Sequence, residues 1–165
     1  MKEVRIILTG GTIDKIHDLK KESLTFSKDQ ASQIPTLLNE ARCYHPTLEQ
    51  LMLKDSLEFT DSDRDRIVNA INVANESAIV VTHGTGTMDK SAQWIAERIQ
   101  DKTVVLTGAM RPHSLARSDG PFNLGGAIIA AQFLPSGVYG VMNGRIFSVE
   151  KLKKNTQKSR FDIPA

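Results

Sequence analysis

The sequence predicts an α/β protein, a three-layer sandwich in which helices cover both faces of a mostly parallel β-sheet. Short runs of β-branched and other apolar residues alternate along the chain with longer segments of helical periodicity. The short runs are apolar throughout, as is typical of strands buried on both faces of a parallel sheet. The length of 165 residues suits a single domain spanning residues 1–165.

Five strands and four helices are expected in alternation. The strands are residues 4–8, 48–53, 78–82, 103–107 and 138–142. The helices are residues 29–42, which Pro35 interrupts, 60–75, 87–100 and 121–133. Thr60 followed by Asp63 is a start signal for the second helix, and Pro121 after Gly120 opens the last one.

Composition narrows the classes of function. The 21 basic and 19 acidic residues leave a net charge of +2, and the basic residues are scattered except near the C-terminus, so we expect no nucleic-acid binding. Cys43 is the only cysteine, which excludes an intramolecular disulfide and fits a reducing compartment. His17, His45, His83 and His113 lack metal-binding spacing, so we expect no metal.

The start of the chain indicates a location. Residues 4–8 form a short strand-like run rather than the long apolar region of a signal peptide, and no stretch approaches the length of a membrane span. We therefore expect a cytoplasmic protein with no membrane partner.

Polar and glycine-rich loops follow four of the predicted strands. They are Thr9-Gly10-Gly11-Thr12, the turn at Ser56, His83-Gly84-Thr85-Gly86-Thr87 and Gly108-Ala109-Met110-Arg111-Pro112. Because ligands of open α/β sheets bind outside the carboxyl ends of the strands, these loops are expected to converge on one site. The glycines allow close approach of a ligand, and the N–H groups that open the helix after Thr85 favour a carboxylate or an oxyanion.

The loops do not match nucleotide-binding motifs. The first reads TGGT rather than GxGxxG, and no GxxxxGK[ST] segment occurs, so we expect no dinucleotide and no other cofactor. The hydroxyls of Thr12, Ser56, Thr85 and Thr87 instead favour acyl transfer, in which a hydroxyl nucleophile needs a base such as a desolvated lysine. The alternative is that the glycines only end a strand and the threonines only cap helices.

Four motifs carry a family resemblance. They are Thr9-Gly10-Gly11-Thr12-Ile13, Thr82-His83-Gly84-Thr85-x-Thr87-Met88, Gly108-Ala109-Met110-Arg111-Pro112 and Ser118-Asp119-Gly120-Pro121-Phe122-Asn123-Leu124. In this order they resemble the L-asparaginase/glutaminase amidohydrolases, nearly end to end but only over the N-terminal domain of that family. The resemblance implies an α/β sandwich that hydrolyses the side-chain amide of asparagine without a cofactor, through a threonine nucleophile.

The resemblance also implies roles for individual residues. Thr12 matches the nucleophile, Thr85 matches a second essential threonine, and Lys154 matches the lysine that acts with it. Ser56 matches the serine that binds the α-carboxylate of the substrate, while backbone N–H groups around Thr85 and Ala109 would stabilise the oxyanion. Residues 151–158 would otherwise be interpreted as a polar and basic surface segment, and the resemblance implies that they supply the catalytic lysine.

Two departures from the family pattern put the substrate and the base in question. Gly86 stands where the family has an aspartate that receives the α-ammonium group, unless Asp119 or a partner subunit replaces it. No tyrosine occurs in residues 13–35, where relatives carry the one that activates the first threonine, so His17 is the candidate base for Thr12.

Relatives complete their sites with the C-terminal domain of a neighbouring subunit, so a homo-oligomer is expected. Two alternatives to asparagine hydrolysis remain open: a non-catalytic module that binds a small carboxylate, and an amidase for a substrate without a free α-amino group.

Overall fold

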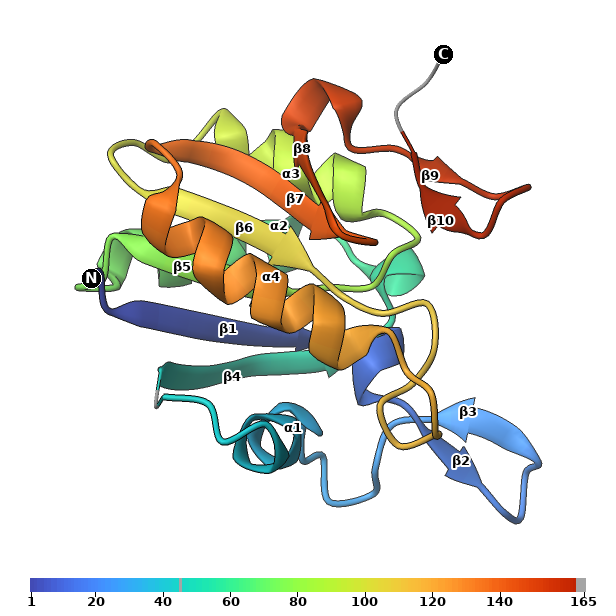
Figure 1. Cartoon of the computed structure of the whole chain (residues 1–165). Coiled ribbons are helices and arrows are strands. Elements are labelled where there is room, and N and C mark those ends of the chain that lie inside the picture. The colour runs from blue at the N-terminus through green and yellow to red at the C-terminus, as the bar shows by residue number, and fades with distance from the viewer. Residues whose placement is uncertain (45, 163–165) are drawn as a thin grey trace.

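A six-stranded β-sheet forms the centre of the protein in the computed structural model, which describes residues 1–44 and 46–162. The spatial order is β4-β1-β5-β6-β7-β8 (Figure 1). Neighbours from β4 to β7 are parallel, and β8 is antiparallel to β7. The strands are β1 Val4–Gly10, β4 Thr47–Lys54, β5 Ala78–Thr82, β6 Thr103–Thr107, β7 Gly137–Met142 and β8 Arg145–Ser148.

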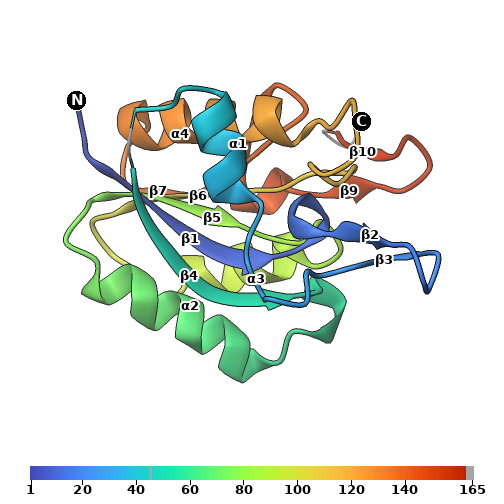
Figure 2. The same ribbon diagram turned by 90° about the horizontal axis from the view of Figure 1, so that it is seen from below.

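Helices cover both faces of this sheet (Figure 2). α1 (Ile34–Glu40) and α4 (Gly120–Phe133) lie on one face, and α2 (Asp61–Val73) and α3 (Met88–Ala96) lie on the other. Because side chains alternate along a strand, Val80 of β5 packs in the cluster with α1 and α4, while Ile79 and Val81 pack in the cluster with α2 and α3. The predicted three-layer α/β sandwich is confirmed.

The start of α2 follows from its first four residues. The Thr60 hydroxyl accepts a hydrogen bond from Asp63 N, and the Asp63 carboxylate accepts one from Thr60 N. This capping box satisfies two backbone donors that a helix start leaves unpaired. The predicted start signal is therefore confirmed, and Ile67 and Ile71 form part of the buried face of the helix.

The helix predicted over residues 29–42 is wrong in its first part. Residues 29–33 lie outside the helix in irregular structure, and Gln30 has a positive φ of 54°. The buried carboxylate of Asp14 accepts hydrogen bonds from Ser32 Oγ (2.6 Å) and Gln33 N (2.7 Å), which fixes the chain just before α1. This long-range contact overrides the local helical pattern.

Five short strands, which form two hairpins and one edge strand, were not predicted. A hairpin of β2 (Ile16–Asp18) and β3 (Ser23–Thr25) follows β1, and a hairpin of β9 (Lys154–Asn155) and β10 (Arg160–Phe161) lies near the C-terminal end. The edge strand is β8, which follows a turn at Asn143-Gly144 with positive φ at both residues. Figure 1 shows both hairpins on the side of the sheet where the parallel strands end.

Candidate functional site

The loops after β1 and β5 touch through their glycines. Gly11 has a φ of 85°, and a Cβ placed on it would lie 2.5 Å from the backbone nitrogen of Gly84. The missing Cβ of Gly11 allows the two backbones to approach this closely. The contact brings the loop that carries Thr12, which begins the short helix η1 (Thr12–Asp14), against the loop that carries Thr85.

Lys154 reaches the same place from the C-terminal hairpin. Its Nζ donates a hydrogen bond to Thr85 Oγ1 over 2.9 Å, although 69 residues separate the two. Thr85 is 7% exposed, and Lys154 is half-buried. The lysine segment is held by Leu152, which is fully buried over Gly140, and by Phe161, whose N–H donates to Asn143 Oδ1.

Ser56 lies beside Gly84 and has an unused hydroxyl. It begins the short helix η2 (Ser56–Glu58), and its Oγ would lie 2.5 Å from a Cβ placed on Gly84. The residue is 1% exposed, and its Oγ has no hydrogen-bond partner among the described residues. Thr87 Oγ1 donates to the Ser56 carbonyl over 2.8 Å, which fastens this turn to the β5 loop. A buried hydroxyl without a partner is expected to bind a ligand or water.

An ion pair connects the Thr12 segment to the Ser56 turn. Lys15 Nζ lies 2.5 Å from Asp55 Oδ2, and Asp55 Oδ1 accepts from Leu57 N. Burial raises the pKa of Asp55, but the hydrogen bond from Lys15 and that from Leu57 N outweigh it and leave the pKa below its ordinary value. The carboxylate therefore stays charged and holds both segments.

Hydrogen bonds of the buried His83 side chain fix the loop that follows β5. His83 Nδ1 donates to Gly84 O over 2.8 Å, and Nε2 accepts from Ser91 Oγ over 2.8 Å. Ser91 Oγ in turn accepts from Arg64 Nε. Burial lowers the pKa of His83 to about 4, so the ring is neutral at pH 7. The sequence pattern did not reveal this role, because it depends on partners from α2 and α3.

The fourth loop is held by the start of α4. Asn123 Nδ2 donates to Gly108 O, and the carboxylate of Asp119 accepts from the backbone N–H groups of Met110 and Arg111. Ala109, between them, is fully buried. Asp119 thus anchors this loop, which makes it a poor substitute for the aspartate missing at position 86.

His17 lies apart from these contacts. It sits on β2, opposite Leu24 in the hairpin register, and it is exposed to solvent. Across the described residues no hydrogen bond links its ring to Thr12. The structure therefore adds no support to His17 as the base, and this role stays a prediction.

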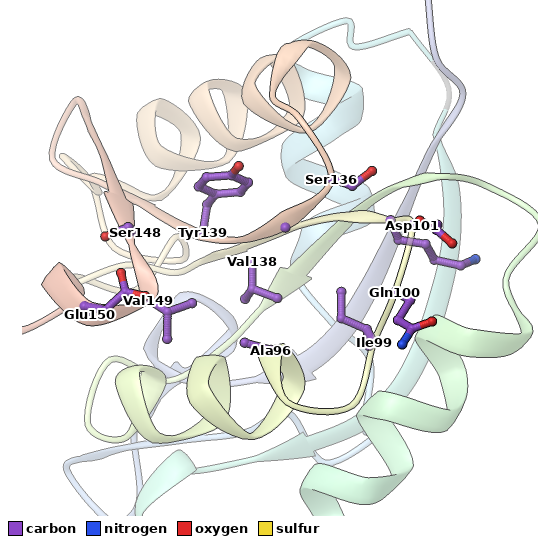
Figure 3. Close-up of a pocket in the computed structure, with 12 residues that line it drawn as sticks. Ala96, Ile99, Gln100, Asp101, Ser136, Val138, Tyr139, Ser148, Val149 and Glu150 are labelled. Atoms are coloured by element: carbon purple, nitrogen blue, oxygen red, sulfur yellow. The ribbon is translucent and has the colours of Figure 1, made fainter.

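A separate cavity lies at the opposite edge of the sheet (Figure 3). Ile99, which follows α3, Val138 at the start of β7 and Val149 after β8 contribute to its lining. The predicted site residues do not take part in it. Within residues 1–44 and 46–162 no three His, Cys, Asp or Glu side chains are grouped to hold a metal ion, and His45 lies outside the described residues. No helix in that same portion is long and apolar enough to cross a membrane.

The geometry therefore defines an α/β sandwich whose carboxyl-end loops bring the Thr12 loop and Ser56 against Gly84 and hold Thr85 against Lys154. Residues 3–163 match the family described as "Asparaginase, N-terminal", and the chain belongs to this family.

The relatives are about twice as long as this chain. It is 31% identical over 165 residues to L-asparaginase 2 of Escherichia coli strain K12, which covers 93% of this chain and 47% of that protein. The structure of a probable cytoplasmic L-asparaginase from Campylobacter jejuni superposes with a TM-score of 0.78 at 29% identity, covering 93% of this chain and 50% of that one. L-asparaginase I from Vibrio cholerae gives a TM-score of 0.81 at 25% identity, covering 96% and 50%. The chain thus spans about half the length of the relatives it matches.

Proposed function

We propose that this chain forms an amidohydrolase site that converts the side-chain amide of L-asparagine, or a related amide, to the acid and ammonia. The observation that carries the proposal is the hydrogen bond between Lys154 Nζ and Thr85 Oγ1, at the edge where the Thr12 loop also lies. A lysine held against a buried hydroxyl can move a proton to or from the reacting groups.

The proposed reaction has two halves. Thr12 Oγ1 bonds to the amide carbon while its proton is taken up, the C–N bond breaks, and ammonia leaves with a proton supplied by the site. Water then attacks the acyl-threonine and releases the acid. Thr85 with Lys154 handles the protons, and backbone N–H groups near Thr85 and Ala109 stabilise the oxyanion. Ser56 Oγ, buried and unpartnered, receives the carboxylate of the substrate.

A second candidate is a binding module without turnover. Gly86 favours it, because the residue brings no side chain to a position where the resemblance implies a substrate-binding carboxylate. The two candidates are separated by whether the purified protein releases ammonia from amides at all.

The assembly, location and domain extent belong to the same proposal. We infer a homo-oligomer, since Phe122, Ile129, Phe133 and Ile146 are large apolar side chains that are more than half exposed along α4 and β8. A cytoplasmic location is supported by the lone Cys43, although one relative is named a probable periplasmic L-asparaginase. That residues 1–165 form one domain stays a prediction.

The test is ammonia release by the wild-type protein and by three variants. Thr12→Ala, Thr85→Ala and Lys154→Met should each lower kcat by about 100- to 10,000-fold, the usual contribution of a positioned proton-transfer group or nucleophile. Lys153→Met is the matched control, since Lys153 is the exposed neighbour. A wild-type protein that releases no ammonia favours the binding module. Equal effects of Lys154→Met and Lys153→Met would refute the role of the lysine.

A further inference from the structure

Leu57 occupies the space that a side chain at position 86 would fill. A Cβ placed on Gly86 would lie 2.7 Å from Leu57 Cδ2 and 3.4 Å from Ser56 Oγ. The leucine is 73% exposed, whereas the neighbouring Ser56 is 1% exposed. A methyl group, a glycine backbone and the unpartnered hydroxyl of Ser56 therefore meet at one point.

The chemistry of an amino-acid substrate places its ammonium group at this point. In an α-amino acid the nitrogen lies about 2.5 Å from the carboxylate carbon, because both are bonded to Cα. A carboxylate bound at Ser56 Oγ would therefore hold the α-ammonium within reach of Leu57 and Gly86. Neither residue offers a side-chain acceptor, so an ammonium group at this point gains no hydrogen-bond partner or opposite charge from them.

The carboxylates of Asp55 and Asp119 already accept hydrogen bonds from other groups of the protein. Asp55 is paired with Lys15 and accepts from Leu57 N. Asp119 accepts from the backbone of the Gly108 loop and from Asn123. Glu58 is exposed at the end of η2, and its role as a partner for the α-ammonium group is tested directly below.

We propose that Leu57 and Gly86 make this site selective for ω-amides that carry a carboxylate but no charged group on the α-carbon, with succinamate as the simplest member of the class. The proposal rests on the proposed function, in which Ser56 receives the carboxylate and the threonine loops receive the amide. It differs from that function in assigning the selectivity to an apolar contact between two loops.

Turnover of three matched amides tests the selectivity. Succinamate and L-asparagine differ only in the α-ammonium group, and N-acetyl-L-asparagine keeps the nitrogen without its charge. Succinamate should exceed asparagine in kcat/KM by about ten- to hundredfold, the range expected when a charged group loses its hydrogen-bond partner. N-acetyl-L-asparagine should also exceed asparagine.

Variants locate the effect. Gly86→Asp should shift the preference toward asparagine, and the double variant with Leu57→Ala, which removes the methyl that a new Cβ would strike, should shift it further. Val73→Asp is the control, because it adds the same charge at a position on α2 that is 78% exposed and lies away from the site. It should leave the ratio unchanged. An unchanged ratio in a folded double variant would overturn the inference.

A binding measurement keeps the inference separate from catalysis. Succinate and L-aspartate are not hydrolysed, so their Kd values for the wild-type protein can be compared by calorimetry. Tighter binding of succinate supports the inference even if no amide releases ammonia, in which case only the proposed function fails. Equal or tighter binding of aspartate, or binding of neither, overturns it. A preference for asparagine that Glu58→Gln abolishes would identify Glu58 as the ammonium partner and overturn it as well.

Discussion

The contact between Gly11 and Gly84 makes a sharp prediction for Gly11→Ala. At Gly11 φ is 85° and ψ is −175°, a backbone conformation that only glycine adopts readily and that costs another residue about 1–3 kcal/mol. The new Cβ would also lie 2.5 Å from Gly84 N and 2.6 Å from Gly84 Cα. These are backbone atoms, so relieving the overlap requires the two loops to separate, at a further cost of about 1–3 kcal/mol.

The expected loss of unfolding free energy is therefore about 2–6 kcal/mol, measured by urea denaturation. For a chain of this size that lowers Tm by at least about 4 °C. Gly125→Ala is the matched control, because Gly125 lies within α4 with nothing within 4 Å of its Cβ position. It should stabilise the protein by about 0.5–1 kcal/mol. If Gly11→Ala unfolds at the same urea concentration as the wild type, the two loops do not touch and the site as built here is wrong.

Two further predictions concern pH and assembly. The pKa of His83 is lowered to about 4 by burial, whereas the unfolded side chain titrates near 6.5. The neutral ring therefore contributes about 3 kcal/mol to the free energy of unfolding above pH 6.5, and this contribution is lost as the pH falls toward 4. Urea titrations of His83→Gln should show a flatter dependence of that free energy on pH than the wild type. Parallel curves for the two proteins would contradict this. Phe133→Ser should lower the mass measured by light scattering if the α4 face joins copies of the chain, whereas Val73→Ser, equally exposed on α2, should leave it unchanged; an unchanged mass for Phe133→Ser would contradict the role of that face.

The sheet could be predicted because its signals are local. Runs such as residues 78–82 and 103–107 are apolar throughout, which is typical of strands covered on both faces, and all five expected strands are present. The same logic placed the loops at one edge, since parallel strands share their carboxyl ends. By contrast, β2, β3, β9 and β10 have two or three residues each, too few to show a period. The strand β8 is not among the predicted strands, although Asn143-Gly144 is a hairpin signal, because the same pair also ends β7 and the four residues after it are too few to show a period.

The residues of the site fall into two groups. Some are predicted by the order of motifs along the chain, and others are recognised only from the contacts in the structure. The resemblance predicts Lys154 as a site residue, and the structure shows this lysine half-buried beside Thr85. Leu152 fits over Gly140, where a Cβ would strike its side chain, so the segment before the lysine is pinned to β7. No equivalent anchor draws His17 toward Thr12, since its hairpin partner Leu24 is itself exposed.

Leu57 and His83 belong to the second group, and they show why a motif alone does not define specificity. Each lies beside a residue that the sequence marks as interesting, Ser56 and Gly84 respectively, and neither has an unusual local pattern. Their effect arises from what the fold brings to them: His83 fixes the Gly84 carbonyl through partners on two helices, and Leu57 fills the space that Gly86 leaves open. The glycine and the leucine are coupled, because a side chain at position 86 and the present leucine rotamer cannot occupy the same volume. A side chain at position 86 therefore requires Leu57 to change its rotamer, so the two positions are expected to act together on the space beside Ser56.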